Sequence, residues 1–334
     1  MPELRRDPVV DRWVIISSNR AERPMTQWTN SEPAEDFFCP FCEGNENSTP
    51  KETFAVRPVE TKPDGKGWSL RVVPNKFPAL VSKGELARSE EGLFLSVSGV
   101  GEHEVLIETA RHSESLANLP VERVADLFRA VKLRTLKFKS DKKNLCVQFF
   151  KNHGMHAGAS LEHSHSQIIA MPVISKRLKE QLDGAKNRFK ELGRCVYCEI
   201  MEAELKTGAR VISENRDFVA IAPFAPRFAY ETMILPKNHS ARYEETANKT
   251  LVSLARIYKD ISFRINSLLN NPPYNMTIHT APLNNDQHDK SFHWHMEIWP
   301  VTTRVAGFEW GSGFHINSVS PEKAATAMRE VQSL

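Results

Sequence analysis

The sequence predicts an α+β protein in which a unit of strands, one helix and further strands is used twice. The first observation is a repeated order of motifs in the 334-residue chain: Cys-x-x-Cys, then His-Ser after an apolar strand, then His-x-His. The second is a helical stretch between the His-Ser and His-x-His motifs of each half, followed by a short strand-like segment. One helix set against short antiparallel strands is typical of the α+β class.

The two copies of the motif set are similar in spacing. The first contains Cys39, Cys42, His112, His163 and His165, and the second contains Cys195, Cys198, His239, His293 and His295. The His-Ser and His-x-His motifs are 51 residues apart in the first half and 54 in the second, but the cysteines precede His-Ser by 73 and 44 residues. We therefore expect an insertion in the first half, for which residues 57–70 and 83–95 are polar, turn-rich candidates.

The helices are predicted from apolar residues at helical spacing. Residues 120–141 carry an apolar stripe that includes Val124, Leu127 and Phe128, and residues 248–269 do likewise. Strands are expected directly after them, at residues 144–152 and 274–282. A further amphipathic helix at 175–193 connects the halves, so we predict two domains, residues 1–175 and 176–334.

Composition excludes several classes of function. The chain has 44 Lys and Arg against 41 Asp and Glu, and this small net charge gives no electrostatic argument for nucleic-acid binding. No apolar run is long enough to cross a membrane, since a spanning helix needs about 20 apolar residues. The N-terminal residues are charged where a signal peptide would need an apolar core. We expect a cytoplasmic protein without structural disulfides, in which Cys146 is a buried thiol.

The Cys-x-x-Cys pairs have two interpretations, a redox pair or half of a zinc site. The segment "DFFCPFCEGN" ends in loop residues rather than opening a helix, which favours zinc. The repeat strengthens this, because two Cys and two His give the tetrahedral ligation of structural zinc. We predict one site at Cys39, Cys42, His112 and His163, and a second at Cys195, Cys198, His239 and His293. For His112 taken alone, the alternative to a role as metal ligand is that it caps a helix.

The segment "LEHSHSQIIAMP", residues 161–172, alternates with the period of a strand. His163, His165 and Gln167 should therefore point to one face of a sheet. The corresponding segment of the second half reads His-Trp-His-Met-Glu, with Glu297 at the position of the glutamine. A carboxylate there would repel a phosphate under attack, so we interpret the second copy as structural.

The motif His-x-His-x-Gln before apolar residues resembles the active-site strand of the histidine-triad superfamily, and more narrowly the galactose-1-phosphate uridylyltransferase family. Four further segments are similar to that family. The first contains Arg20 and Arg23, the second Asn75 and Phe77, the third Asn152, Gly158 and Ser160, and the fourth Phe308 and Glu309. Better-known members have His-Pro-His-Gly-Gln, whereas this chain has His-Ser-His-Ser-Gln, closer to a relative that phosphorolyses ADP-glucose. A lysine that some members carry is replaced by Thr303 or Arg304.

The resemblance implies two tandem histidine-triad-like domains with a half-barrel-like core, the first catalytic. It implies a UDP-glucose–hexose-1-phosphate uridylyltransferase that binds a nucleotide sugar and a sugar 1-phosphate, holds zinc and forms a homodimer. Relatives differ in the metal of the second site, so another metal is an alternative there. An ADP-sugar or dinucleoside-polyphosphate phosphorylase is the alternative reaction. A non-catalytic zinc protein that binds nucleotides is the alternative of another class.

Chemistry assigns roles to these residues. A neutral imidazole can attack phosphorus and then leave, which suits His165 as the nucleophile of a double displacement. The Gln167 amide, the Ser160 hydroxyl and the backbone N–H groups of residues 156–160 can donate to the phosphoryl oxygens. Arg20 and Arg23 offer forked donors to phosphate, although each could equally be a surface charge. No Walker-type loop is present, which argues against kinase chemistry.

Substrate contacts are expected in two further segments. Glu309 can accept hydrogen bonds from sugar hydroxyls, and Phe308 offers an apolar surface beside Trp310. The alternative is that these aromatic residues belong to the core. By resemblance, Asn75 and Phe77 contact the ribose and base, and Asn152 and Gly158 lie at the phosphate.

Overall fold

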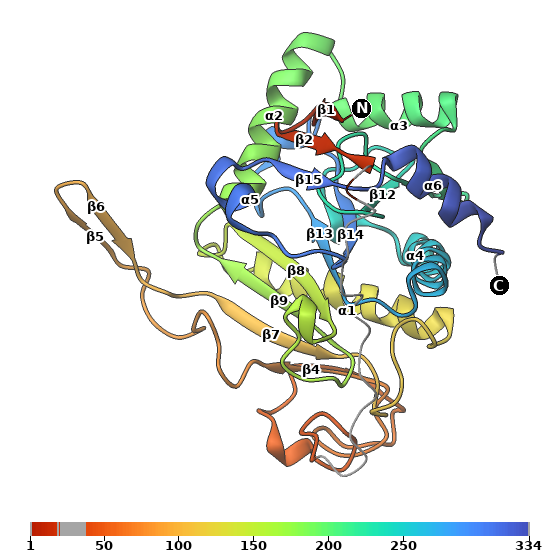
Figure 1. The fold of residues 1–334 in the computed structure, drawn as a ribbon. Helices are drawn as coiled ribbons and strands as arrows, with labels where there is room; N and C mark the ends of the chain where they lie inside the picture. The colour runs from red at the N-terminus through yellow and green to blue at the C-terminus, as the bar shows by residue number, and fades with distance from the viewer. Residues whose placement is uncertain (1, 19, 21–37, 333–334) are drawn as a thin grey trace.

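The computed structural model describes residues 2–18, 20 and 38–332, and its centre is one ten-stranded sheet (Figure 1). In sheet order the strands are β10 (Val211–Glu214), β11 (Phe218–Ile221), β12 (Thr232–Pro236), β14 (His295–Pro300), β13 (Tyr274–His279), β8 (Cys146–His153), β9 (His165–Met171), β7 (Glu102–Ile107), β4 (Leu70–Pro74) and β3 (Phe54–Val56). Every neighbouring pair is antiparallel. The predicted α+β class is confirmed.

The two repeats share this sheet because β8 of the first pairs with β13 of the second, with Tyr274 opposite His153 and Ile278 opposite Phe149. The pairing satisfies backbone groups that would otherwise form two exposed edges at the centre of the molecule. The strands on either side of the junction follow mirrored orders, β8-β9-β7 and β13-β14-β12. The active-site strand β9 and its counterpart β14 are thus each one strand away from the junction.

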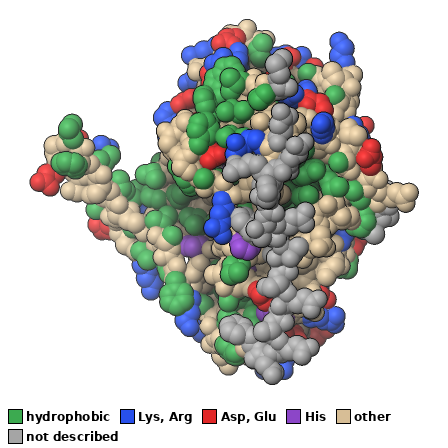
Figure 2. All heavy atoms as spheres, in the orientation of Figure 1, with side chains coloured by type: hydrophobic (Ala, Val, Ile, Leu, Met, Phe, Trp, Pro, Cys, Tyr) green, Lys and Arg blue, Asp and Glu red, His purple; other side chains and the backbone are tan. Residues whose placement is uncertain are grey.

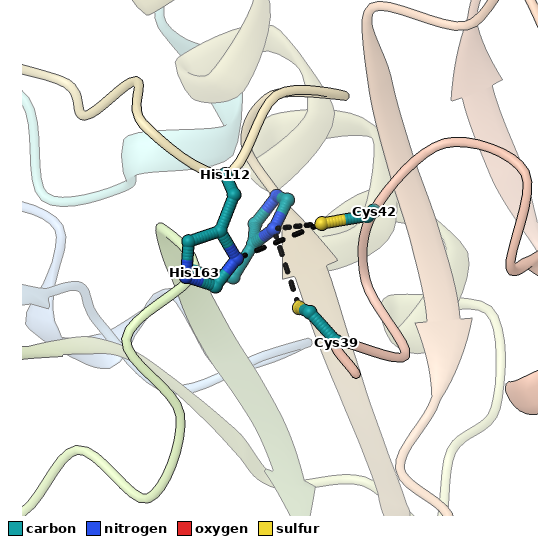
Figure 3. Close-up of side chains that lie close together, drawn as sticks. All are labelled: Cys39, Cys42, His112 and His163. Atoms are coloured by element: carbon teal, nitrogen blue, oxygen red, sulfur yellow. Dashed lines mark hydrogen bonds between the residues drawn. The ribbon is translucent and has the colours of Figure 1, made fainter. Parts of the chain in front are cut away.

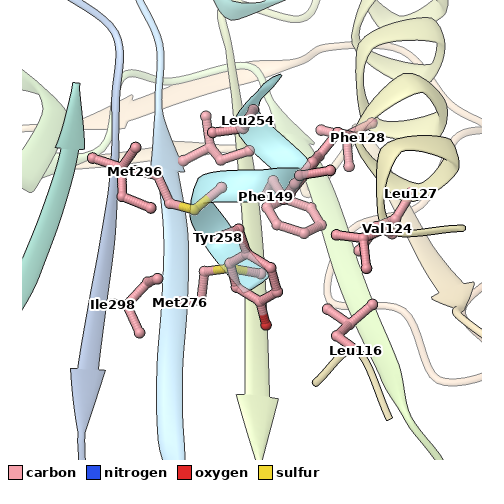
Figure 4. Packing of buried hydrophobic residues seen from close by; sticks show 14 of the residues in the cluster. Leu116, Val124, Leu127, Phe128, Phe149, Leu254, Tyr258, Met276, Met296 and Ile298 are labelled. Atoms are coloured by element: carbon pink, nitrogen blue, oxygen red, sulfur yellow. The ribbon is translucent and has the colours of Figure 1, made fainter. Parts of the chain in front are cut away.

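One face of the sheet is covered by helices from both halves. These are α1 (Val121–Lys139) and α4 (Asn248–Leu269), which agree with the helices predicted at 120–141 and 248–269. Their buried faces meet the sheet in one hydrophobic cluster, in which Phe128, Tyr258 and Phe149 pack together with Met276 (Figure 4). Burying apolar side chains from both repeats in one core supplies the main stabilisation that holds the halves together.

The opposite face differs between the halves. In the second half α2 (Lys176–Leu192) and α3 (Val196–Thr207) contribute Leu182 and Tyr197 to a cluster with Phe292. In the first half the corresponding cluster is small and holds Trp68, Val73, Val105 and Ile107. The helix expected at 175–193 therefore packs against the second repeat and also against Cys146 and Met171, at one end of β8 and β9 in the first.

Smaller elements surround the sheet. They are β1 (Glu3–Arg6), β2 (Trp13–Ile16), β15 (His315–Asn317), α5 (Gly307–Ser312), α6 (Pro321–Glu330), β5 (Arg88–Glu91), β6 (Phe94–Val97) and the short 3₁₀ helices η2 (Glu46–Ser48), η3 (Met155–Ala157), η4 (Tyr243–Glu245) and η5 (Asp286–His288). The β5–β6 hairpin projects away from the body (Figure 1) and overlaps the insertion expected at 83–95, extending two residues beyond it. Among the described helices, none has the length and apolar character of a membrane span.

Candidate active site and metal centres

The first Cys and His set converges in space as the spacing predicts (Figure 3). Cys39 Sγ lies 3.5 Å from His163 Nδ1, and Cys42 Sγ lies 3.6 Å from both His163 Nδ1 and His112 Nδ1. The candidate ligand atoms of the four residues all lie within 4.8 Å of one another. Cys39 and Cys42 come from a turn, His112 from the segment after β7, and His163 from the residues that lead into β9.

The chemistry of this set fits a divalent metal ion. The Nε2–H of His163 donates to the carbonyl oxygen of Thr109 at 2.8 Å, which leaves the Nδ1 lone pair directed at the cysteines. Burial lowers the pKa of His163 to about 4, so the ring is neutral, as a ligand must be. Burial and the adjacent Cys39 raise the pKa of Cys42 to about 11, and a bound cation would supply the charge that allows both thiols to ionise.

The second set converges in the same manner. Cys198 Sγ lies 3.4 Å from His239 Nδ1 and 3.6 Å from His293 Nδ1, and Cys195 completes the group within 4.8 Å. The His239 Nε2–H donates to the carbonyl oxygen of Asp289 at 2.7 Å, as His163 donates to Thr109 in the first set. Both predicted ligand sets are therefore assembled by the fold, and the two Cys-x-x-Cys pairs are free thiols within it.

His165 lies at the start of β9, on the face opposite α1 and α4, and the residue is 6% exposed. Its Nδ1 donates to the carbonyl oxygen of His163 at 2.8 Å, so Nε2 carries the lone pair. Burial lowers the pKa of His165 and keeps the imidazole neutral. Figure 2 shows histidine side chains reaching the surface on this side of the molecule, next to Lys or Arg side chains.

Gln167, two residues along the same strand, is oriented by a residue that sequence reasoning missed. The backbone N–H of Ala79 donates to His103 Nδ1 at 3.0 Å, so the proton of that imidazole is on Nε2. This Nε2–H donates to Gln167 Oε1 at 2.8 Å, and Asn75 Nδ2 donates to the same oxygen at 3.3 Å. With its oxygen occupied by two donors, the Gln167 amide has its NH₂ group free for another acceptor.

The end of β8 and the loop between β8 and β9 hold the remaining predicted phosphate contacts. Asn275 Nδ2 donates to Asn152 Oδ1 at 2.9 Å and to the carbonyl oxygen of Ala157 at 2.8 Å, which ties the loop to the second repeat. Gly158 ends η3 in the left-handed conformation, with φ of 90°, which favours glycine. Ser160, two residues further along, is exposed, so its hydroxyl is accessible to a ligand.

In the second repeat, the residue at the position that corresponds to Gln167 is engaged in ion pairs. Glu297 on β14 is 3% exposed, and its carboxylate accepts from Arg227 at 2.7 Å and from Arg177 at 3.4 Å. His295 is completely buried, and burial lowers its pKa to about 3. The strand that corresponds to β9 therefore has neither an accessible imidazole nor a free donor, which agrees with the structural role expected for the second copy.

The other expected contact residues are dispersed. Arg20 is exposed, and Arg23 lies outside the described residues. Phe77 is 84% exposed, and its neighbour Asn75 lines a cavity of about 660 Å³ that His103 and residues of α1 also line. Phe308 and Trp310 are 47% and 79% exposed, so the alternative that they belong to the core is wrong. Glu309 Oε2 accepts from the backbone N–H of Ala306 at the start of α5.

Comparison with known proteins decides the family. The family model described as galactose-1-phosphate uridyl transferase, N-terminal domain, matches residues 1–175, and the model of the C-terminal domain matches residues 176–332. The chain belongs to the galactose-1-phosphate uridylyltransferase family. It is 39% identical to an ADP-glucose phosphorylase from Arabidopsis thaliana, over 99% of this chain and 93% of that one. It is 29% identical to a galactose-1-phosphate uridylyltransferase from Thermotoga maritima, over 99% of both chains.

Solved structures give the same assignment. The crystal structure of the Arabidopsis thaliana ADP-glucose phosphorylase with bound ADP-glucose has a TM-score of 0.85 and 37% sequence identity, covering 99% of this chain and 100% of that one. A structure described as a uridylyltransferase has a TM-score of 0.76 at 26% identity, covering 99% of this chain and 98% of that one. The named relatives are nucleotidyltransferases. This member of the galactose-1-phosphate uridylyltransferase family is an enzyme of the same class.

Proposed function

We propose that the protein transfers a nucleotidyl group from a nucleotide sugar by double displacement, with His165 as the nucleophile. The observation that carries the proposal is the hydrogen bond from His165 Nδ1–H to the carbonyl oxygen of His163, which leaves the Nε2 lone pair on the face of β9 opposite α1 and α4. A neutral imidazole held in one tautomer is ready to attack without first losing a proton. The lowered pKa of His165 acts in the same direction.

The reaction has two displacements at the same phosphorus. In the first, the Nε2 lone pair forms a bond to the α-phosphorus, the bond from phosphorus to the bridging oxygen breaks, and sugar 1-phosphate leaves with that electron pair. In the second, a phosphate oxygen of the acceptor forms a bond to the same phosphorus, and the bond from phosphorus to Nε2 breaks. His165 is thereby restored, and the nucleotide leaves joined to the acceptor.

Neighbouring groups stabilise the charge on the phosphoryl oxygens. The free NH₂ group of Gln167 and the hydroxyl of Ser160 are donors in this role, and each donor of this kind contributes roughly 10²–10³ in rate. Cys39, Cys42, His112 and His163 would hold a zinc ion that fixes the residues leading into β9. Arg20 and Arg23 bind the phosphate groups. The other residues that contact the substrate are Asn75, Phe77, Asn152, Gly158, Phe308 and Glu309.

Two substrates are candidates. The sequence-based expectation is UDP-glucose with a hexose 1-phosphate acceptor, the reaction of a uridylyltransferase. The 39% identity to an ADP-glucose phosphorylase, against 29% to a uridylyltransferase, supports ADP-glucose with inorganic phosphate as the acceptor. The His-Ser-His-Ser-Gln motif supports the same candidate, which we prefer.

The deciding experiment uses UDP-glucose and ADP-glucose, each labelled at the α-phosphate and incubated with the enzyme without acceptor. The expected result is label on the protein from ADP-glucose, and its release as ADP when inorganic phosphate is added. Label from UDP-glucose alone, released by galactose 1-phosphate as UDP-galactose, would establish the uridylyltransferase reaction. No label from either substrate in the wild-type enzyme, with His165→Ala as the blank, would refute the covalent mechanism.

Three further expectations belong to the proposal. The catalytic part comprises residues 1–175. Residues 176–334 supply the sugar-contacting segment and the second metal site, which holds zinc or another metal. The protein acts as a homodimer in the cytoplasm. The exposed β5–β6 hairpin supports the dimer, because a two-stranded hairpin in water is marginally stable without a packing partner.

A further inference from the structure

A buried polar cluster lies directly behind the nucleophile, on the face of the sheet that α1 and α4 cover. It consists of Glu108, Lys151, Ser164 and Ser166, all of which are at most 4% exposed. Lys151 Nζ donates to Glu108 Oε2 at 2.7 Å, to Ser164 Oγ at 3.2 Å and to the carbonyl oxygen of His165 at 3.0 Å. The cluster therefore joins three neighbouring segments: the residue just after β7, the second half of β8 and the start of β9 with the residue before it.

Both serines donate to the same carboxylate. Ser164 Oγ donates to Glu108 Oε2 at 2.5 Å, and Ser166 Oγ donates to Glu108 Oε1. These serines flank His165 in the sequence, and strand alternation sends their side chains to the face opposite its imidazole. The backbone on either side of the nucleophile is thus held to one buried carboxylate, while the nucleophile's own carbonyl oxygen is held by Lys151.

The position of the imidazole depends on this backbone. Its Nδ1–H donates to the carbonyl oxygen of His163, which belongs to the peptide group that joins His163 to Ser164. A rotation of that peptide would redirect the ring and move Nε2. A buried ion pair adds little net stability compared with an apolar replacement, so stability alone does not explain Lys151 and Glu108 in this core.

We propose that Glu108, Lys151, Ser164 and Ser166 are positioning residues, which set the location and direction of His165 Nε2 for attack on phosphorus. The inference rests on the proposed function, since it assumes that His165 is the nucleophile. The cluster touches neither the substrate nor the reacting atoms, and its effect passes through the backbone of residues 163–166. A misplacement of a reacting group by about 1 Å costs roughly a hundredfold in rate, so a cluster that prevents it has a measurable kinetic effect.

The test is Ser164→Ala with Ser166→Ala, a double variant that removes both donors and leaves the Lys151–Glu108 pair in place. The matched control is Ser262→Ala, which removes a similarly buried hydroxyl from α4 that is not part of this cluster. Labelled ADP-glucose and UDP-glucose are supplied without acceptor, and the rate of label transfer is measured at increasing substrate concentration. Zinc content and Tm are recorded for the same preparations.

The expected result is a fall of about ten- to a hundredfold in the maximal rate of labelling, with the half-saturating concentration, zinc content and Tm close to those of Ser262→Ala. Labelling at the wild-type rate by the double variant would overturn the inference and leave the proposed function intact. A fall in rate that accompanies equal losses of zinc and Tm would also overturn it, because the cluster would then only support the fold. A wild-type enzyme that takes no label would overturn the proposed function and this inference together.

Ser164→Thr with Ser166→Thr provides a rescue, because it restores a hydroxyl at both positions. A labelling rate above that of the double alanine variant is expected. Equal rates for the two double variants would mean that the hydroxyl donors do not act on His165, which contradicts the inference.

Discussion

His103 Nε2 donates a hydrogen bond to Gln167 Oε1 at 2.8 Å, from β7 to the neighbouring strand β9. This bond determines which end of the Gln167 amide is available to a phosphoryl oxygen. His103→Leu should therefore reduce protein labelling by about tenfold, because an amide that is free to flip presents its oxygen to the phosphate for part of the time. The measurement is the labelling rate from nucleotide sugar in the absence of acceptor.

A double-mutant cycle separates this effect from a general disturbance of the site. His103→Leu combined with Gln167→Ala should be no slower than Gln167→Ala alone, because His103 acts through the glutamine. Additive losses would show that His103 has a separate role.

Replacement of the nucleophile should abolish labelling while the fold remains. His165→Ala removes the covalent path but no metal ligand, so the zinc content and Tm should stay close to those of the wild type. His165→Gly should regain some transfer when imidazole is added, since it leaves space for an external nucleophile. Label on His165→Ala at the wild-type level would place the nucleophile elsewhere.

The two metal sites should be lost independently. Cys39→Ser should remove metal from the first site and strongly reduce both Tm and labelling, because binding energy at a structural site is folding energy. Cys195→Ser should remove metal from the second site and reduce Tm with a smaller effect on labelling. Metal analysis of protein purified without chelator measures both. Unchanged metal content in either variant would contradict the ligand assignment.

The projecting hairpin should carry the dimer contact. Leu93 and Phe94 at its turn are 98% and 78% exposed, and Figure 2 shows hydrophobic side chains at the end of this projection. The wild type should have twice the 37.9 kDa chain mass in light scattering, and Leu93→Glu with Phe94→Glu should have the single mass. Val59→Glu, at a fully exposed apolar residue elsewhere, is the control and should remain dimeric. A wild-type mass of one chain at micromolar concentration would contradict the prediction.

His153 should make the stability depend on pH. Burial lowers its pKa to about 4 from 6.5, so between these values the unfolded chain binds more protons than the folded one. The stabilisation is complete above pH 6.5 and is lost as the pH falls toward 4. His153→Gln should therefore lose less Tm between pH 7 and pH 5 than the wild type. Equal losses would mean that His153 titrates normally in the folded protein.

Helices α1, α2 and α4 and both metal sets could be predicted from the sequence, because they are encoded in local spacing. The apolar period of residues 248–269 coincides with α4, and the repeated Cys-x-x-Cys, His-Ser and His-x-His order assigned both groups of four candidate ligands. The alternation of residues 161–172 likewise placed His165 and Gln167 on one face of a strand. Each of these inferences needs only the period of one element, or one motif compared with its repeat.

The neighbours of those residues on adjacent strands follow from the packing of the whole chain. "GEHEVLIE" is an ordinary alternating strand in the sequence, and nothing in it indicates that His103 meets Gln167 or that Glu108 meets Lys151. The sequence also gives no indication that β8 of the first repeat pairs with β13 of the second, so that the two repeats form one sheet. Cross-strand neighbours depend on the register between segments far apart in the chain, and packing of the whole core sets that register. Local periodicity specifies which face a side chain occupies but carries no information about the strand next to it.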